Sequence, residues 1–206
     1  YVPQGWYRIT ETLKMKPDTK LIGLHPFGTQ FRLDESTAAF SGFGGPKAMV
    51  ESSEGGANML VGIGINTGGY NYRAVGVKWM ANADSYMNDV KFVGGHGGLW
   101  KPKPGVEEPR GRWNRPARIS SPDNPVAASG MDLAWDNQYW SLWVTNNGGG
   151  TFKDIWTAST YATNGFYANN TSTPGRIYAM SIEHHVRNEV RFSKVSNWKV
   201  YCMQTE

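Results

Sequence analysis

The chain has 206 residues and a formal net charge of +4, and only 18% of its residues are charged, which is too few for a coiled coil or a disordered tail. Lysine and arginine are scattered rather than clustered, which argues against nucleic acid as a partner. No apolar run approaches the roughly 18 residues of a membrane-spanning helix, so we expect no membrane partner. The 25 glycines and the 13% of aromatic residues favour an all-β protein, which needs many turns and flat apolar surfaces.

Short apolar runs follow one another along the chain, separated by Gly, Asn, Asp, Ser and Pro, and none has the spacing of an amphipathic helix. In chain order, the predicted strands cover 6–10, 19–24, 58–65, 73–80, 88–93, 141–145, 151–156, 176–182, 189–195 and 197–203. Several runs begin with Asn or Asp followed by alternating apolar residues, as at 88–92, 153–156 and 196–200. This recurrence indicates a repeating structural unit.

A six-residue motif repeats near the end of the sequence. YAMSIE at 178–183 returns as YCMQTE at 201–206, so that Tyr, Met and Glu recur after a step of 23 residues. A step of this size is typical of one coil of a solenoid, and we predict a parallel β-helix. A jelly roll or a sandwich would also contain many short strands, but neither readily explains a motif repeated at one coil length.

Residues 100–138 interrupt the strand pattern. This stretch of nearly forty residues is rich in Pro, Arg and Asn, which is too long for a routine connection between strands. We predict a long insertion in one β-helix domain that covers 1–206. Because the sequence opens and closes as if in mid-element, we also expect it to be part of a longer chain that contains a further β-helix or other domains.

Glu183 and Glu206 would be neighbours if 23 residues make one coil, because stacked strands lie about 4.8 Å apart. Two carboxylates this close repel, so the pKa of at least one should rise. This suits general acid catalysis, which uses one protonated and one ionised carboxyl group. The alternative is a solvated ladder of glutamates paired with the nearby cations Arg187, Arg191 and Lys199.

His184 and His185 follow the first glutamate directly. In a strand, successive side chains point to opposite faces, so one of the two histidines should share a face with the carboxylates. There it could tune the pair or bind a sugar hydroxyl. We expect no metal ion, because no third ligand stands at a typical metal-binding spacing, and we expect no cofactor.

Aromatic side chains precede the glutamates in the sequence. Trp and Tyr rings stack on the apolar faces of sugar rings, and the candidates are Trp135, Tyr139, Trp140, Trp143 and Trp156. About half of these are expected to fill the core instead. Alternation in the run 141–145 predicts that Leu142 and Val144 point inward and Trp143 outward.

The combination of EHH at 183–185 and QTE at 204–206 resembles the active-site region of glycoside hydrolase family 55, the β-1,3-glucanases or laminarinases. The Gly5-Trp6-Tyr7 opening and the Gly-rich run 148–150, which leads into an aromatic strand, match the same family more loosely. The resemblance implies a right-handed, single-stranded parallel β-helix of the pectate-lyase-like type. It also implies an extracellular protein, whose signal peptide would lie outside this sequence.

The same resemblance implies that Glu206 is the general acid and that Glu183 orients or polarises the attacking water. His184, His185 and Gln204 would bind substrate with Trp135, Tyr139, Trp143 and Trp156. The family inverts the anomeric centre, so a water molecule must fit between the base and the sugar. In the family, residues that help to hold this water come from a first β-helix, and no residue of this chain matches them.

We therefore expect an inverting glycoside hydrolase that cleaves β-glucan, with a polysaccharide or oligosaccharide as its partner. One alternative is a β-helix polysaccharide lyase, which would need a basic proton abstractor and a cationic cradle for a uronate. Another is a solenoid that binds glycans without cleaving them, in which the glutamates are only structural.

Overall fold

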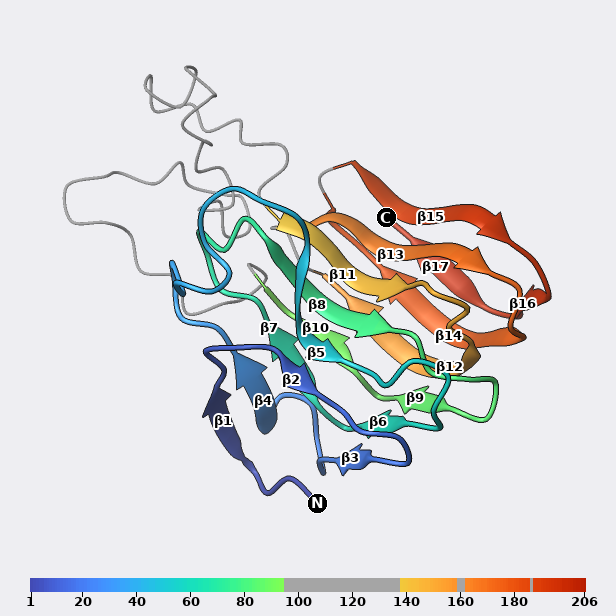
Figure 1. Ribbon diagram of the computed structural model, residues 1–206, viewed down its shortest axis with the longest axis horizontal. Coiled ribbons are helices and arrows are strands. Elements are labelled where there is room, and N and C mark those ends of the chain that lie inside the picture. The colour runs from blue at the N-terminus through green and yellow to red at the C-terminus, as the bar shows by residue number, and fades with distance from the viewer. Residues whose placement is uncertain (95–137, 159–161, 186) are drawn as a thin grey trace.

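The computed structural model describes residues 1–94, 138–158, 162–185 and 187–206 (Figure 1). These residues form 17 strands and no helix, and thus contain no helix long and apolar enough to cross a membrane. All of the strand pairs are parallel, which confirms the prediction of an all-β protein with parallel strands. The predicted insertion 100–138, apart from Gln138, lies outside the described residues.

The larger sheet has eleven strands in two parallel rows, which we call lane 1 and lane 2. Lane 1 contains β3 (Lys20–Ile22), β6 (Met59–Val61), β9 (Tyr86–Asn88) and β16 (Trp198–Val200). Lane 2 contains β1 (Gly5–Arg8), β4 (Thr29–Arg32), β7 (Gly64–Asn66), β10 (Lys91–Phe92) and β17 (Met203–Thr205). The long strands β12 (Gly150–Thr157) and β14 (Gly175–Ile182) run through both lanes.

The second sheet has six strands in one row. It contains β2 (Leu13–Lys14), β5 (Lys47–Glu51), β8 (Ala74–Trp79), β11 (Gln138–Val144), β13 (Ala162–Thr171) and β15 (Asn188–Val195). The chain passes repeatedly from the two lanes to this sheet and back, and its colours advance in order along the molecule from β1 to β17 (Figure 1). This arrangement is consistent with a β-helix-like solenoid.

The predicted 23-residue step is confirmed by the pairing of β14 with β17. Met180 lies opposite Met203, and Ser181 lies opposite Gln204. The rings of Tyr178 and Tyr201 stack with their centroids 4.6 Å apart and an interplanar angle of 4°. Equivalent residues of the repeated motif are therefore direct neighbours in space.

The bend between lane 1 and lane 2 is made by residues in the left-handed conformation. Gly62, Asp89, Asp154 and Ala179 have φ values of +64°, +51°, +50° and +59°, and they follow residues that pair in register from strand to strand. Gly and Asp adopt this conformation more readily than other residues. Two of the predicted strands, 58–65 and 88–93, are divided at this bend because the left-handed residue turns the backbone between the lanes.

Side chains between the sheets form apolar ladders. Leu60, Met87, Phe152 and Ile177 succeed one another in lane 1, each paired with the next, and all are fully buried. In lane 2 the ladder runs Phe31, Ile65, Phe92, Thr157 and Ile182. Thr157 is the polar member of this second ladder and has no solvent exposure, so its hydroxyl needs a partner inside the molecule.

Candidate functional site

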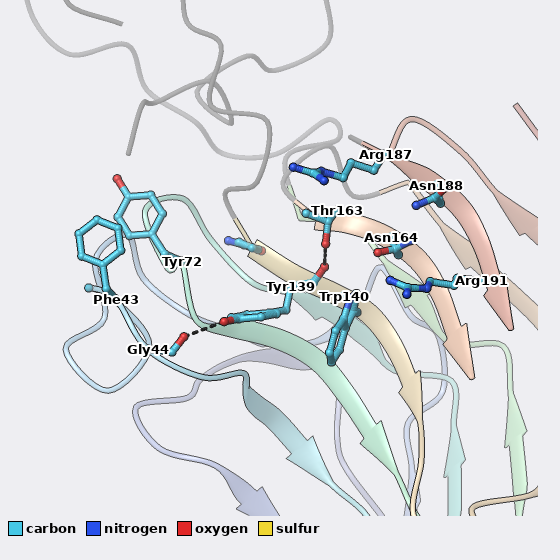
Figure 2. Close-up of a pocket in the computed structure, with 12 residues that line it drawn as sticks. Phe43, Gly44, Tyr72, Tyr139, Trp140, Thr163, Asn164, Arg187, Asn188 and Arg191 are labelled. Atoms are coloured by element: carbon cyan, nitrogen blue, oxygen red, sulfur yellow. Dashed lines mark hydrogen bonds between the residues drawn. The ribbon is translucent and has the colours of Figure 1, made fainter. Parts of the chain in front are cut away.

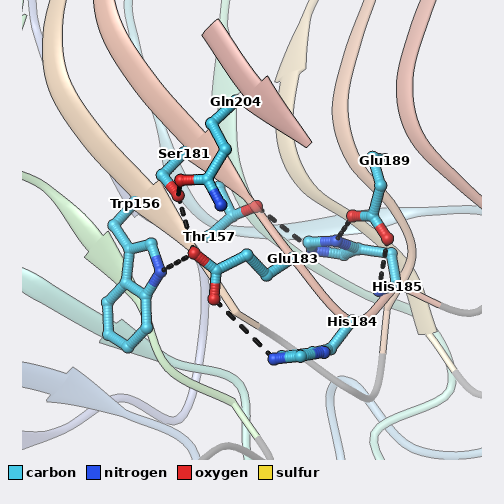
Figure 3. A network of polar contacts seen from close by, with 8 residues as sticks. All are labelled: Trp156, Thr157, Ser181, Glu183, His184, His185, Glu189 and Gln204. Carbon is cyan, nitrogen blue, oxygen red and sulfur yellow. Dashed lines mark hydrogen bonds and ion pairs between the residues drawn. The ribbon is translucent and has the colours of Figure 1, made fainter. Parts of the chain in front are cut away.

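Glu183 directly follows β14, next to Trp156 and Ser181 (Figure 3). Its backbone N–H donates to the Thr157 carbonyl oxygen at 2.8 Å, which continues the sheet by one residue. The carboxylate Oε1 accepts hydrogen bonds from Ser181 Oγ at 2.6 Å and from Trp156 Nε1 at 3.1 Å. The side chain is only 16% exposed, so two donors from adjacent strands fix the orientation of this carboxylate.

Glu206 occupies the equivalent position one step later. Its backbone N–H donates to the Ile182 carbonyl oxygen at 3.2 Å, and its own carbonyl oxygen accepts from the His184 N–H at 3.3 Å. Its side chain is exposed. The predicted pairing of the two glutamates is therefore present in the backbone, but Glu183 is held by neighbours whereas Glu206 faces solvent.

Gln204 and Ser181 form a polar link between the two strands. They lie opposite each other in the register of β14 and β17, and the Ser181 hydroxyl lies 3.0 Å from Gln204 Oε1. A hydroxyl group carries one hydrogen and can donate to only one acceptor at a time. Ser181 therefore connects Glu183 with Gln204 as alternative acceptors of the same proton.

The two histidines point in different directions, and the backbone of His184 is left-handed, with φ of +64°. The His184 side chain is 31% exposed, and its Nε2 lies 3.7 Å from Glu183 Oε2. His184 thus shares the outer face with the carboxylate, as predicted for one member of the pair. When protonated, its imidazolium ring would form an ion pair with Glu183.

His185 points into the space between the sheets, and its side chain has no solvent exposure. Its Nε2 lies 3.2 Å from Thr157 Oγ1 and 3.4 Å from Ser141 Oγ, and its Nδ1 lies 2.5 Å from Glu189 Oε2. Burial lowers the pKa of His185, while the hydrogen bond to Glu189 acts in the opposite direction. In this position His185 cannot touch a bound substrate directly, and it supports the segment that carries Glu183 and His184.

Gly165 provides the space for the His185 ring. A Cβ atom at this position would lie 2.2 Å from Ile182 Cγ2 and 2.6 Å from His185 Cε1. Both distances are well below van der Waals contact, so even alanine would force the surroundings to move. The imidazole and this glycine therefore form one packing unit across β13 and β14.

The predicted aromatic residues separate into two groups. Trp156 is half-buried beside Glu183, and its ring lies 6.1 Å from that of Phe27. Trp143 and Tyr139 lie on β11 in the other sheet, and the indole N–H of Trp143 donates to Asn169 Oδ1 at 2.8 Å. Trp135 lies outside the described residues.

The predicted orientation of β11 is confirmed near its end. Leu142 and Val144 are fully buried, whereas Trp143 is half-buried on the outer face. Lys78 Nζ lies 5.3 Å from the centroid of the Trp143 ring, so this indole already has a cationic neighbour on one side. Alternation holds for 142–144 only: it also predicts Ser141 and Thr145 on the outer face, but both are buried, and Ser141 contacts the buried His185.

Three residues of the site were not singled out by the sequence. Ser181 stands two residues before Glu183, on the same face of β14, and this spacing could have identified it. Glu189 contacts His185 from four residues further along the chain, and no sequence pattern signals that contact. Phe27 comes from a distant part of the chain, and no local signal connects it with Trp156.

Chemically, this face of lane 2 combines an oriented carboxylate, a second carboxylate, an amide and an exposed aromatic edge. Among the described residues, no group of three or more His, Cys, Asp and Glu side chains is arranged to hold a metal ion. No family model matches the sequence, and no curated protein matches it either.

Proposed function

We propose that this chain is a right-handed, single-stranded parallel β-helix of the pectate-lyase-like type and an inverting glycoside hydrolase that cleaves β-1,3-linked glucan. The carrying observation is the stacking of β14 on β17, which brings Glu183 and Glu206 to equivalent positions on one face. The resemblance to glycoside hydrolase family 55 supplies the substrate. We further propose that the protein acts outside the cell and that a further β-helix or other domains of the same chain complete the cleft.

In the proposed reaction Glu206 is the general acid. Its exposed side chain is able to approach a glycosidic oxygen above the sheet and deliver a proton to the leaving group. Glu183 is the partner carboxylate that orients or activates the attacking water. The inverting course comes from the resemblance, and such a reaction requires room for a water molecule between the base and the sugar.

The neighbours of Glu183 are suited to this role. Ser181 and Trp156 both donate to Oε1, which leaves Oε2 facing His184 and available to a water molecule. A carboxylate that is held in advance loses little freedom when the reaction begins, and such preorganisation lowers the barrier. Gln204 and the Trp156–Phe27 pair would contact the sugar rings.

The nature of the products tests the proposal. The complete protein is incubated with laminarin, a neutral β-1,3-glucan, and separately with polygalacturonate, an acidic polymer. A hydrolase releases reducing sugar from laminarin, and proton NMR at early times should show the α-anomer, as inversion of a β-linkage requires. Products with ultraviolet absorption from an unsaturated ring would indicate a lyase instead, and binding without cleavage of either polymer would indicate a glycan-binding solenoid.

A further inference from the structure

A pocket of about 490 Å³ lies against the outer face of the six-stranded sheet (Figure 2). The segment 42–44, Tyr72 and the first residues of β11, β13 and β15 line it. Its volume is in the range of small-molecule sites. It is distinct from the Glu183 face, because none of Glu183, His184, Gln204 and Trp156 belongs to its lining.

One wall of the pocket is aromatic. The rings of Phe43 and Tyr72 stack with centroids 6.1 Å apart and an interplanar angle of 7°, and Phe43 is 64% exposed. Tyr139 meets Trp140 edge to face at 5.3 Å, and the Tyr139 hydroxyl donates to the Gly44 carbonyl oxygen at 2.8 Å. This hydrogen bond ties the segment with Phe43 to β11, so the aromatic wall is held in place before any ligand arrives.

The opposite wall is cationic. Arg191 lies on β15, and its guanidinium carbon stands 4.9 Å from the centroid of the Tyr167 ring. Arg187 also lines the pocket, and its backbone N–H donates to the Thr163 carbonyl oxygen at 3.0 Å. The described lining contains no Asp or Glu. A guanidinium group can bind a carboxylate through two parallel hydrogen bonds, so the chemistry of this wall is suited to a negatively charged group.

Asn164 also lines the pocket and lies beside Arg191 in the view of Figure 2. It is only 3% exposed, and its Nδ2 is buried with no hydrogen-bond partner among the described residues. A buried donor without a partner costs about 1–3 kcal/mol. A ligand oxygen next to this amide would remove that cost after a small rotation of the side chain.

We propose that this pocket binds an acidic saccharide. A pyranose ring stacks on the aromatic wall, its carboxylate pairs with Arg191 and Arg187, and a ring or hydroxyl oxygen accepts from Asn164. A neutral glucan could accept hydrogen bonds from the arginines but would not compensate their charge, so the proposed ligand class differs from that of the site proposed for hydrolysis. It stands independently of the reaction at Glu183 and Glu206.

Isothermal titration calorimetry on the full chain tests the proposal, with trigalacturonate as the probe and its fully methyl-esterified form as the matched neutral ligand. We expect trigalacturonate to bind at least tenfold more tightly than the ester, and its affinity to fall as salt rises because salt screens the charge pair. No binding of trigalacturonate, or equal binding of the ester, would overturn the proposal. Tighter binding of a nucleoside monophosphate would overturn it as well.

Variants of one arginine locate the binding. Arg191→Gln should weaken trigalacturonate binding tenfold or more, and Arg191→Lys should retain part of it because the charge remains while the fork is lost. Arg176→Gln is the matched control, since Arg176 is exposed on β14 outside the pocket. Native affinity in both Arg191 variants would show that the ligand binds elsewhere. Hydrolysis of laminarin should be unchanged in all three variants, which separates this test from that of the proposed function.

Discussion

The Glu183 face and the pocket lie on different sheets and differ in their chemistry. Glu183 and Gln204 offer acceptors on lane 2, and Ser181 and Trp156 satisfy the Glu183 carboxylate. The pocket instead offers arginines, aromatic rings and the unpaired amide of Asn164. The comparison shows that the two sheets of one scaffold can carry outward side chains of different charge. Parallel register determines which residues become neighbours, and it leaves the chemical type of the outward residues free to differ between the sheets.

His185 contacts strands that belong to both regions. Its Nε2 lies within hydrogen-bonding distance of both Thr157 on β12 and Ser141 on β11, and Ser141 directly follows the pocket residue Trp140. The lane 2 ladder changes from apolar residues to Thr157 at this level. The packing of His185 therefore supports both regions, although its side chain belongs to neither surface.

The largest expected effect is on the rate of hydrolysis. Glu206→Gln retains shape but supplies no proton, so cleavage of laminarin should slow about 10²–10⁴-fold. An aryl glycoside with a good leaving group should lose much less, while Glu183→Gln should slow both substrates alike. The measurement compares initial rates on both substrates in the complete protein.

Arg191→Gln is the counterpart in that experiment and should hydrolyse laminarin at the native rate. A loss of rate similar to that of Glu206→Gln would mean that the two regions form one site. Near-native rates for both glutamate variants would leave the stacked glutamates as a structural ladder.

The next largest effect is on the free energy of unfolding and concerns the packing of Gly165 against His185. Gly165→Ala should destabilise the protein by about 1–3 kcal/mol, the usual cost of overpacking a filled interior. The control is Gly45→Ala, because a Cβ there meets no atom within 4 Å and its φ is not positive. Urea unfolding of both variants gives the comparison, and equal midpoints would show that the His185 ring is not closely packed.

A smaller effect is the dependence of stability on pH. Burial lowers the pKa of His185 in the folded state below its ordinary value of 6.5, so between the folded and unfolded pKa values the unfolded chain binds more protons. The contribution of His185 to the free energy of unfolding is therefore fully present above about pH 6.5, and it is lost as the pH falls below that value. The His185→Gln variant should show a flatter stability profile between pH 7 and pH 5, measured by urea unfolding. A slope unchanged from the native protein would assign the effect to other groups.

The smallest expected effect is a change in the free energy of unfolding at the bend between lane 1 and lane 2. Ala179 has φ of +59° and is exposed, and a left-handed alanine carries a strain of about 1–2 kcal/mol. Ala179→Gly should therefore raise the unfolding free energy by about 0.5 kcal/mol after the entropy cost of glycine. Ala57→Gly is the matched control, because Ala57 does not have a positive φ, and it should lower stability. Thermal unfolding measures both, and a decrease for Ala179→Gly would contradict the strain argument.

The last step of the stacking could be predicted from the sequence. The repeated Tyr, Met and Glu fixed the register of β14 on β17, because residues one coil apart become direct neighbours. The outward position of Trp143 followed from simple alternation. These predictions needed only distances along the sequence, which parallel stacking converts into distances in space.

Other features depend on the rest of the structure. β13 (Ala162–Thr171) was not predicted, because its sequence ATNGFYANNT is rich in residues that favour turns. It is a strand because β11 and β15 satisfy its backbone on both sides, and tertiary context overrides weak local preference. The contact of His185 with Glu189 was equally hidden, since it depends on how the chain folds between β14 and β15.

The pairing of β9 with β12 has a consequence for chain entropy. Asn88 lies opposite Lys153, although most neighbouring strands of this sheet pair at much shorter separations in sequence. The cost of closing a connection grows only with the logarithm of its length, by about 0.6 kcal/mol for each doubling. The entropy cost of pairing two strands in this scaffold therefore depends only weakly on how many residues separate them in the sequence.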